Sequence, residues 1–348
     1  MRIMKKPSIL LIYTGGTIGM RSDANGTLVP FDFNAMYEEI PSIKRLNVDI
    51  DVLTMTPIDS SNVTPRRWVE LAEIIRDNYR RFDGFVVLHG TDTMSYTASA
   101  LSFMLENLAK PVILTGSQIP MGILRTDGRE NLITALEIAG AVRDGRPVVP
   151  EVALYFQNRL FRGNRTTKQS AEELSAFSSY NYPALAEVGV NIAYNHAAIA
   201  HPVDDGGELR IATSLSEGVV VIKLFPGIGE GILRAILSVD GLKGVVLETY
   251  GSGNAPTSEW FVAALREAIA RGIVVMNVTQ CAGGSVSMGL YETGMRLQSL
   301  GVISGHDMTT EAAVTKLMYL LGGERPDAER RRLLLEPVKG EFTPDDVA

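Results

Sequence analysis

The chain has 348 residues, of which 45% are hydrophobic and 21% are charged, and its formal net charge is −7. This length and apolar content exclude a disordered chain and favour two domains. The negative charge excludes the clustered basic surface that nucleic acids or anionic membranes require, so small-molecule chemistry is the favoured class.

The compartment follows from a few local features. Cys281 is the only cysteine, which excludes an intramolecular disulfide, and we interpret it as a small core residue. The basic segment 1–7 runs into a strand-length apolar stretch without a small-residue cleavage pattern, so we expect no signal peptide. No apolar run reaches the roughly 20 residues that span a bilayer. We therefore expect a soluble, cytoplasmic protein.

The first half of the chain alternates strand and helix patterns. Strands, each bounded by turn residues, are predicted at residues 8–13, 49–53, 84–88, 111–115 and 151–156. Thr64 and Pro65 have the character of a helix start, and four apolar residues follow at helical spacing: Trp68, Leu71, Ala72 and Ile75. A second helix pattern covers 94–108. This alternation predicts a mostly parallel sheet with helices on both faces.

The regular pattern stops in a polar stretch that contains Asp204-Asp205-Gly206-Gly207. We place a linker at 194–217, after a larger N-terminal catalytic α/β domain at 1–193. A smaller C-terminal α/β domain is predicted at 218–348. Its strands are expected at 219–224, 244–247 and 273–278, and its helices at 230–237 and 258–270.

Two threonines follow buried strands of the predicted sheet. Thr14 follows the first strand and precedes two glycines, and Thr91 follows the third strand and Gly90. Both should lie at the carboxyl ends of neighbouring strands, where open α/β sheets bind ligands. A threonine hydroxyl is a weak nucleophile that needs a base and an oxyanion pocket. Glycine turns let backbone N–H groups approach such an oxyanion.

Charged residues near these threonines suit the same chemistry. Asp92 adds a carboxylate that can orient a lysine or bind a substrate ammonium group, and Lys168 lies in a polar loop after the fifth strand. Burial beside Thr91 would lower the pKa of Lys168 and make the amine a base. The alternatives are that Lys168 is an ordinary exposed lysine, and that Thr91 and Asp92 only cap the helix starting near Met94.

Other site classes fit less well. The Gly16-x-x-Gly19 spacing matches part of a dinucleotide-binding fingerprint, but Thr14 stands where its first glycine belongs. His89 ends an apolar strand and is interpreted as a hydrogen-bonded core histidine rather than a base. The four histidines do not recur at metal-ligand spacing, which disfavours a zinc site or a Ser-His-Asp triad.

Several segments closely resemble motifs of the bacterial type I (cytoplasmic) L-asparaginases. The strongest matches are Tyr13-Thr14-Gly15-Gly16-Thr17-Ile18-Gly19-Met20, His89-Gly90-Thr91-Asp92-Thr93-Met94, Thr115-Gly116-Ser117-Gln118 and Gly163-Asn164-Arg165-Thr166-Thr167-Lys168. Matches at 59–61, 250–256, 279–281 and 308–311 extend the resemblance over almost the whole chain. The resemblance implies hydrolysis of L-asparagine to L-aspartate and ammonia, without a metal or an organic cofactor.

The resemblance also implies roles for individual residues. Thr14 would attack the amide carbon and form a covalent β-aspartyl intermediate. Thr91, Asp92 and Lys168 would aid this attack and activate water, and Asp92 would also bind the substrate ammonium group. Three residues would hold the α-carboxylate through hydroxyl and backbone donors: Asp59, Ser60 and Ser61.

The chain departs from the family pattern at two places. Residues 21–30 contain no tyrosine, so we consider Tyr291 as the group that reaches the nucleophile. Glu248 stands where some type I enzymes have an arginine that, with the cysteine matching Cys281, binds asparagine as an activator. A glutamate would repel the carboxylate of that effector, so we expect weak or absent activation.

The family also implies a homodimer or a homotetramer, in which Asn254 would help to close the partner's pocket. Two further functions stay open besides an asparaginase. One is a broader asparaginase/glutaminase amidase or the amide-releasing subunit of a tRNA-dependent amidotransferase, which would carry an extra N-terminal domain. The other is a silent amino-acid-binding module, which would require broken chemistry among Thr14, Thr91, Asp92 and Lys168.

Overall fold

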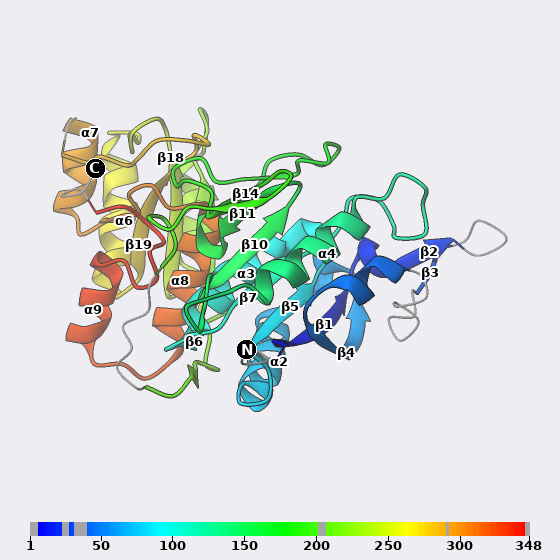
Figure 1. Ribbon diagram of the computed structural model, residues 1–348. Helices are drawn as coiled ribbons and strands as arrows, with labels where there is room; N and C mark the ends of the chain where they lie inside the picture. The colour runs from blue at the N-terminus through cyan, green and yellow to red at the C-terminus, as the bar shows by residue number, and fades with distance from the viewer. Residues whose placement is uncertain (1–5, 23–27, 31–39, 201–206, 290–291, 345–348) are drawn as a thin grey trace. The chain divides into compact units, whose positions relative to one another are not determined.

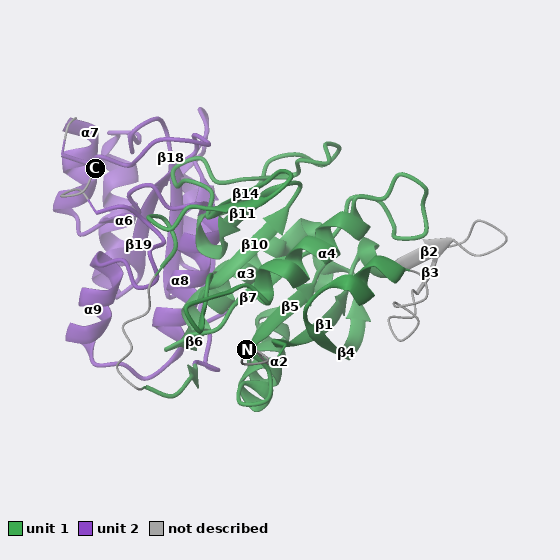
Figure 2. Ribbon diagram, in the orientation of Figure 1, with its two compact units in different colours: residues 1–211 green, residues 212–348 purple. Residues whose placement is uncertain are grey.

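The computed structural model describes residues 6–22, 28–30, 40–200, 207–289 and 292–344. The chain divides into two compact units, residues 1–211 and 212–348 (Figure 2). This division falls inside the segment 194–217, whose exact role as a linker stays a prediction. Each unit combines parallel strands with helices, which confirms the predicted fold class.

Unit 1 is built around a large sheet, which has eight strands among the described residues (Figure 1). In spatial order the strands are β15 (Ile192–Tyr194), β14 (Ala186–Val188), β11 (Arg159–Arg162), β10 (Val152–Phe156), β7 (Val112–Thr115), β5 (Gly84–Leu88), β1 (Ser8–Gly15) and β4 (Asp49–Ile58). Neighbours from β10 to β4 are parallel, and the remaining pairs are antiparallel. The five predicted strands are therefore confirmed, and the structure adds three antiparallel ones.

Helices cover both faces of this sheet. They are α2 (Pro65–Asn78), α3 (Met94–Met104) and α4 (Gly128–Ala139). Leu132 and Leu136 of α4 belong to one buried cluster with Leu11 and Val86 of the sheet. Phe85 faces the other way, because successive strand residues alternate, and its ring stacks on Tyr79, just after α2, at 6.1 Å between centroids. Burial of a phenylalanine stabilises a fold by about 1.5–3 kcal/mol, so both layers contribute.

Short elements connect the main ones in unit 1. They are η1 (Thr17–Gly19), β2 (Met20–Ser22), β3 (Leu28–Pro30), η3 (Pro41–Arg45), η4 (Ser60–Asn62), η5 (Thr91–Thr93), β6 (Leu105–Glu106), β8 (Val142–Arg143), β9 (Arg146–Pro147), η6 (Gly163–Arg165), β12 (Thr167–Lys168), β13 (Phe177–Ser178) and β16 (Arg210–Ile211). The helix predicted over 94–108 ends at Met104, because the next two residues form β6 and pair with β16.

Unit 2 contains a smaller parallel sheet in the order β17 (Val219–Lys223), β18 (Gly244–Thr249), β19 (Val274–Thr279) and β20 (Ile303–Ser304). Its described helices are α5 (Glu230–Leu237), α6 (Glu259–Ala270), α7 (Glu292–Ser299), α8 (Thr310–Gly322) and α9 (Asp327–Leu335). The predicted strands and helices of this region are confirmed with shifts of one or two residues at their ends. In the part of the chain that the structure describes, no helix combines the length and apolarity needed to cross a membrane.

Candidate active site

The two motif threonines lie at adjacent strand ends in unit 1. Strands β1 and β5 pair in parallel with Tyr13 opposite Leu88, so both leave the sheet at the same edge. Thr14 is buried, and its hydroxyl donates a hydrogen bond to the Leu88 carbonyl oxygen at 2.9 Å. Thr91 follows Leu88 by three residues in the turn η5 and is also buried. The expected placement on neighbouring strands is confirmed.

Glycines let three motifs approach one another at this edge. Gly16 has a φ of +88°, and a Cβ atom on it would lie 2.4 Å from the Gly90 Cα. A Cβ atom on Gly90 would in turn lie 2.6 Å from the Ser60 Oγ. Such separations are far below van der Waals contact, so the Gly90 backbone fills the space where a Gly16 side chain would stand, and the Ser60 side chain fills that of Gly90. The loops after β1, β4 and β5 therefore converge on one small region.

Lys168 joins this region through two hydrogen bonds. Its Nζ donates to the Thr91 Oγ1 at 3.0 Å and to the Asp92 Oδ1 at 2.7 Å. The Lys168 side chain is 18% exposed, whereas that of Asp92 is 62% exposed. Lys168 is thus not an ordinary surface lysine. Nor do Thr91 and Asp92 cap the following helix, because Thr93 occupies the N-cap position of α3.

A rigid support precedes Lys168 in the chain. The Arg162 Nε pairs with the Glu151 Oε2 at 2.8 Å just before η6. The guanidinium groups of Arg162 and Arg165 lie 4.4 and 5.0 Å from the centroid of the Tyr182 ring. Cation–π contacts of this kind are strongest where water is excluded, and both arginines are buried. The turn that carries Lys168 is therefore held by charge pairing and ring contacts.

Gln118 is a site residue that the sequence reasoning quoted in a motif but did not assign to the site. Its Oε1 accepts a hydrogen bond from the Thr91 hydroxyl at 3.1 Å. Its Nε2 donates to the carbonyl oxygens of Ala171 and Glu173, both at 3.2 Å, in the loop after Lys168. Gln118 therefore orients the Thr91 hydroxyl and ties it to the lysine-bearing loop. Its place just after β7, at the same edge as Thr14, was the available signal.

The three residues expected to bind a carboxylate form a turn after β4. Ser61 donates to the Asp59 Oδ1 from its backbone N at 2.8 Å and from its Oγ at 2.6 Å. These two bonds, the hydroxyl bond first, hold the pKa of Asp59 below its usual value. The Ser60 carbonyl accepts from the Thr93 hydroxyl at 2.7 Å, which links this turn to η5. Binding of a substrate carboxylate by Ser61 therefore requires that its donors leave Asp59.

Comparison with known proteins identifies the family of this chain. A family model described as "Asparaginase, N-terminal" matches residues 8–200, and one described as "Glutaminase/Asparaginase C-terminal domain" matches 218–334. The chain belongs to the asparaginase family. L-asparaginase 1 of Escherichia coli (strain K12) is 46% identical over 99% of this chain and 100% of its own length.

Two further relatives are informative. The crystal structure of L-asparaginase I from Vibrio cholerae superimposes with a TM-score of 0.87 at 41% identity, covering 97% of this chain and 100% of that one. The human 60 kDa lysophospholipase is 44% identical over 97% of this chain, but the match covers only 62% of that longer protein. The asparaginase fold is therefore present over nearly the whole chain.

The remaining predicted residues lie in or near unit 2. Tyr291 falls outside the described residues. The Asn254 backbone is bonded to Tyr250, and its Oδ1 accepts from the Thr293 hydroxyl at 2.7 Å. Cys281 is exposed, so its interpretation as a core residue was wrong: it follows β19 in a loop where no apolar layer covers it. Glu248 accepts from the Thr310 hydroxyl at 2.6 Å.

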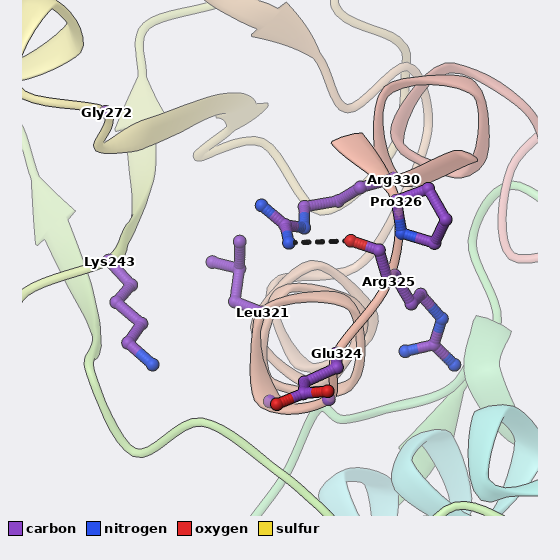
Figure 3. Close-up of a pocket in the computed structure, with 9 residues that line it drawn as sticks. Lys243, Gly272, Leu321, Glu324, Arg325, Pro326 and Arg330 are labelled. Atoms are coloured by element: carbon purple, nitrogen blue, oxygen red, sulfur yellow. Dashed lines mark hydrogen bonds between the residues drawn. The ribbon is translucent and has the colours of Figure 1, made fainter. Parts of the chain in front are cut away.

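Unit 2 has an open cavity of about 580 Å³ between β18, β19 and the end of α8 (Figure 3). It is lined by Lys243, Gly272, Leu321, Gly322, Gly323, Glu324, Arg325, Pro326 and Arg330. Arg330 donates to the Arg325 carbonyl oxygen at 3.1 Å, and Arg325 lies over the Tyr319 ring. None of these nine lining residues carries a hydroxyl, thiol or imidazole group, so the cavity offers no counterpart of the Thr14 or Thr91 hydroxyl. We place the candidate chemistry in unit 1.

Proposed function

We propose that this chain hydrolyses the side-chain amide of L-asparagine to L-aspartate and ammonia. The observation that carries the proposal is the Lys168 Nζ, hydrogen-bonded to both the Thr91 hydroxyl and the Asp92 carboxylate. Membership of the asparaginase family supports the same reaction class. The group formed by Lys168, Thr91 and Asp92 lies at the carboxyl ends of strands β1 and β5, where Thr14 also lies.

In the first half of the proposed reaction, the Thr14 oxygen attacks the amide carbon. Backbone N–H groups of the glycine turns stabilise the oxyanion, the leaving NH₂ group takes up the proton that Thr14 gives up and departs as ammonia, and a β-aspartyl ester of Thr14 remains. The Thr14 hydroxyl now donates to the Leu88 carbonyl, which is not a base, so its proton needs another acceptor. We assign this acceptor to Tyr291, and unchanged turnover of Tyr291→Phe would remove the assignment.

In the second half, water attacks the same carbon, the ester bond to Thr14 breaks, and the Thr14 oxygen takes up a proton that the water has given up. Thr91 takes a proton from this water and passes its own hydroxyl proton to the Lys168 amine, so the 3.0 Å hydrogen bond between the Lys168 Nζ and the Thr91 Oγ1 reverses its direction in this step. Asp92 has one oxygen bonded to Lys168 and is mostly exposed, which leaves its other oxygen for the substrate ammonium group. Ser60 and Ser61, with Asp59 beside them, bind the α-carboxylate.

We further propose a cytoplasmic homodimer or homotetramer in which Asn254 helps to close the partner's pocket. Activity that falls on dilution below the dissociation constant of the assembly would support this arrangement. A monomer with full activity would contradict it.

The test is ammonia release from L-asparagine and L-glutamine by the wild-type chain and by Thr14→Ala. We expect release from asparagine, and a loss of at least about 1,000-fold in kcat for the variant, because removal of a nucleophile abolishes the covalent route. Glutamine differs by one methylene, which a pocket rejects by only about 1–3 kcal/mol, so slower glutaminase activity is expected.

Thr17→Ala is a suitable control for Thr14→Ala, because it removes a hydroxyl from the same loop without touching the proposed nucleophile. Equal losses in both variants would indicate a folding defect rather than chemistry. Absence of ammonia release from either substrate would overturn the asparaginase proposal and favour a binding module.

A further inference from the structure

His89 lies between the strand β5 and the turn that carries Thr91, and it is only 2% exposed. Its ring is bonded at both nitrogens. The Nδ1 lies 2.7 Å from the Gly90 carbonyl oxygen, and the Nε2 lies 2.9 Å from the Thr97 Oγ1 in α3. The Trp68 Nε1 in α2 donates to the same Thr97 oxygen at 2.9 Å. A continuous chain of hydrogen bonds thus joins two helices to the Gly90 carbonyl.

The indole N–H at one end and the carbonyl oxygen at the other end determine which atom donates in each of these hydrogen bonds. An indole N–H can only donate and a carbonyl oxygen can only accept. The His89 Nδ1 must therefore carry a proton, which it donates to Gly90. Burial lowers the pKa of His89 to about 4, so the ring is neutral near pH 7 and its Nε2 accepts from the Thr97 hydroxyl. The Thr97 hydroxyl thus donates to His89, and His89 donates to the Gly90 carbonyl oxygen.

The Gly90 carbonyl belongs to the same peptide group as the Thr91 N–H. In a trans peptide these two groups point in opposite directions. A donor that holds the carbonyl toward the helices therefore turns the Thr91 N–H away from them, and it also polarises that N–H. The space available to Gly90 is limited on its other side by Gly16 and Ser60.

We propose that His89 is a positioning residue, whose Nδ1–H tautomer orients the Gly90–Thr91 peptide so that the Thr91 N–H serves as an oxyanion donor. The proposal rests on the proposed amide hydrolysis for its catalytic readout. His89 touches neither the substrate nor the reacting atoms in this scheme. It acts through the peptide that it holds.

Two amide variants separate the roles of the ring nitrogens. In His89→Asn the side-chain NH₂ replaces Nδ1 and can still donate to Gly90. In His89→Gln the amide reaches the position of Nε2, near Thr97, and the donor to Gly90 is lost. We expect His89→Gln to lower kcat 30-fold to 300-fold with little change in KM, as for loss of one oxyanion donor (roughly 10²–10³). His89→Asn should keep kcat within about fivefold of wild type on the same scale.

A purely structural role predicts a different outcome. Both variants would then lose stability to a similar extent, and kcat per folded molecule would stay near that of wild type in each. Equal kcat values for His89→Asn and His89→Gln would therefore overturn the proposal. An inactive wild-type protein would overturn the proposed function itself. The His89 tautomer would then still be tested by spectroscopy, as follows.

The tautomer is measured without any substrate. In the intact protein, ¹⁵N-labelled histidine should show a protonated Nδ1 and an unprotonated Nε2 for His89 at neutral pH, and its signal is assigned by its loss in His89→Asn. Thr97→Val should weaken this preference, because it removes the hydroxyl that donates to Nε2. A His89 ring protonated at Nε2 in the wild-type chain would contradict the proposal whatever the activity.

Discussion

Both units carry threonines at the carboxyl ends of two neighbouring parallel strands, but the polar groups at these ends have different partners. In unit 1, Lys168 reaches from a separate loop to the Thr91 hydroxyl and the Asp92 carboxylate. In unit 2, the Thr249 hydroxyl donates to the Asn277 Oδ1 at 2.7 Å, and both residues are fully buried. The same topology therefore carries the proposed catalytic group in one unit and a buried hydrogen-bonded pair in the other.

The difference lies in whether the polar groups satisfy one another within the core. Beside Thr249, the Gln280 Nε2 donates to the Leu224 and Glu248 carbonyl oxygens at 2.7 and 2.8 Å. These bonds satisfy two backbone carbonyl oxygens at the same strand ends. In unit 1 the side chains of Lys168 and Asp92 remain partly open to solvent. We therefore expect substitutions at the unit 1 strand ends to change activity and substitutions at the unit 2 strand ends to change stability.

The largest expected effect comes from Lys168→Arg, which changes the hydrogen-bonded group of Lys168, Thr91 and Asp92 in unit 1 but keeps its positive charge. Lys168→Arg keeps a cation that can pair with Asp92, but a guanidinium does not give up its proton in proteins. We expect kcat for asparagine to fall by about 10²–10⁴, the usual contribution of a general base, with almost no change in the thermal midpoint. Steady-state kinetics and a melting curve measure both. A variant that turns over at the wild-type rate would show that Lys168 takes no proton.

The next effect concerns the closed pair in unit 2. Thr249→Val keeps the side-chain shape but leaves the Asn277 Oδ1 without this donor, which costs about 1–3 kcal/mol of stability. Urea unfolding should show this loss, whereas kcat per folded molecule should stay within a factor of two. Thr249→Ser, which keeps the hydroxyl, is the matched control. A large fall in kcat would mean that the two strand ends are not as different as their bonds indicate.

A smaller expected effect is a pH dependence of the free energy of unfolding, which comes from the buried His89 of unit 1. Burial, the main cause, lowers the pKa of His89 to about 4, against 6.5 for an ordinary histidine. Between these values the unfolded chain binds a proton that the folded chain does not, so stability falls as pH decreases from 6.5 toward 4. The slope from this one group is at most about 1.4 kcal/mol per pH unit.

Free energies of unfolding for wild type and His89→Asn, measured between about pH 7 and pH 4.5, isolate this contribution. The difference between the two proteins should change with pH in that window and become constant above it. Parallel curves for the two proteins would show that His89 carries the same charge in both states.

The smallest expected effect is the absence of activation by asparagine. Glu248 is bonded to Thr310 and lies 3.4 Å from the Lys223 Nζ, so its carboxylate is already held inside unit 2. It would repel the carboxylate of an amino acid effector. Initial rates should follow a hyperbola over a wide range of asparagine concentrations. A sigmoidal curve would show that unit 2 holds a second binding site after all.

The sequence was informative where a local pattern decides the structure. Strand β5 was predicted with its observed bounds because Gly84–Leu88 is continuously apolar and flanked by turns. The helix α3 was predicted too long, because β6 pairs with a strand more than 100 residues away, and no local pattern reports such a pairing. The antiparallel strands β14 and β15 were missed because each has only three residues, too few to show an alternating pattern, although they pair locally with each other.

In the candidate site, too, the residues placed by local patterns were predicted, and one placed by distant contacts was not. Thr14, Thr91 and Asp92 follow strands whose ends are local features, and Lys168 was found only through its type and its motif. Gln118 was not assigned, since its role depends on the Thr91 hydroxyl and on two carbonyls 53 and 55 residues away. Cys281 was expected inside because cysteine is commonly buried, yet the loop that holds it is exposed.

The contact between Gly16 and Gly90 has a consequence for how the site responds to substrate. Two loops that meet through side chains must restrict rotamers when a ligand orders them, at about 0.5–1.5 kcal/mol for each rotamer-rich side chain. At Gly16 the two loops approach through the backbone atoms of Gly16, Gly90 and His89, which have no rotamers to restrict. The spacing between the Thr14 loop and the Thr91 loop is thus set during folding, and substrate binding carries no entropic cost at this contact.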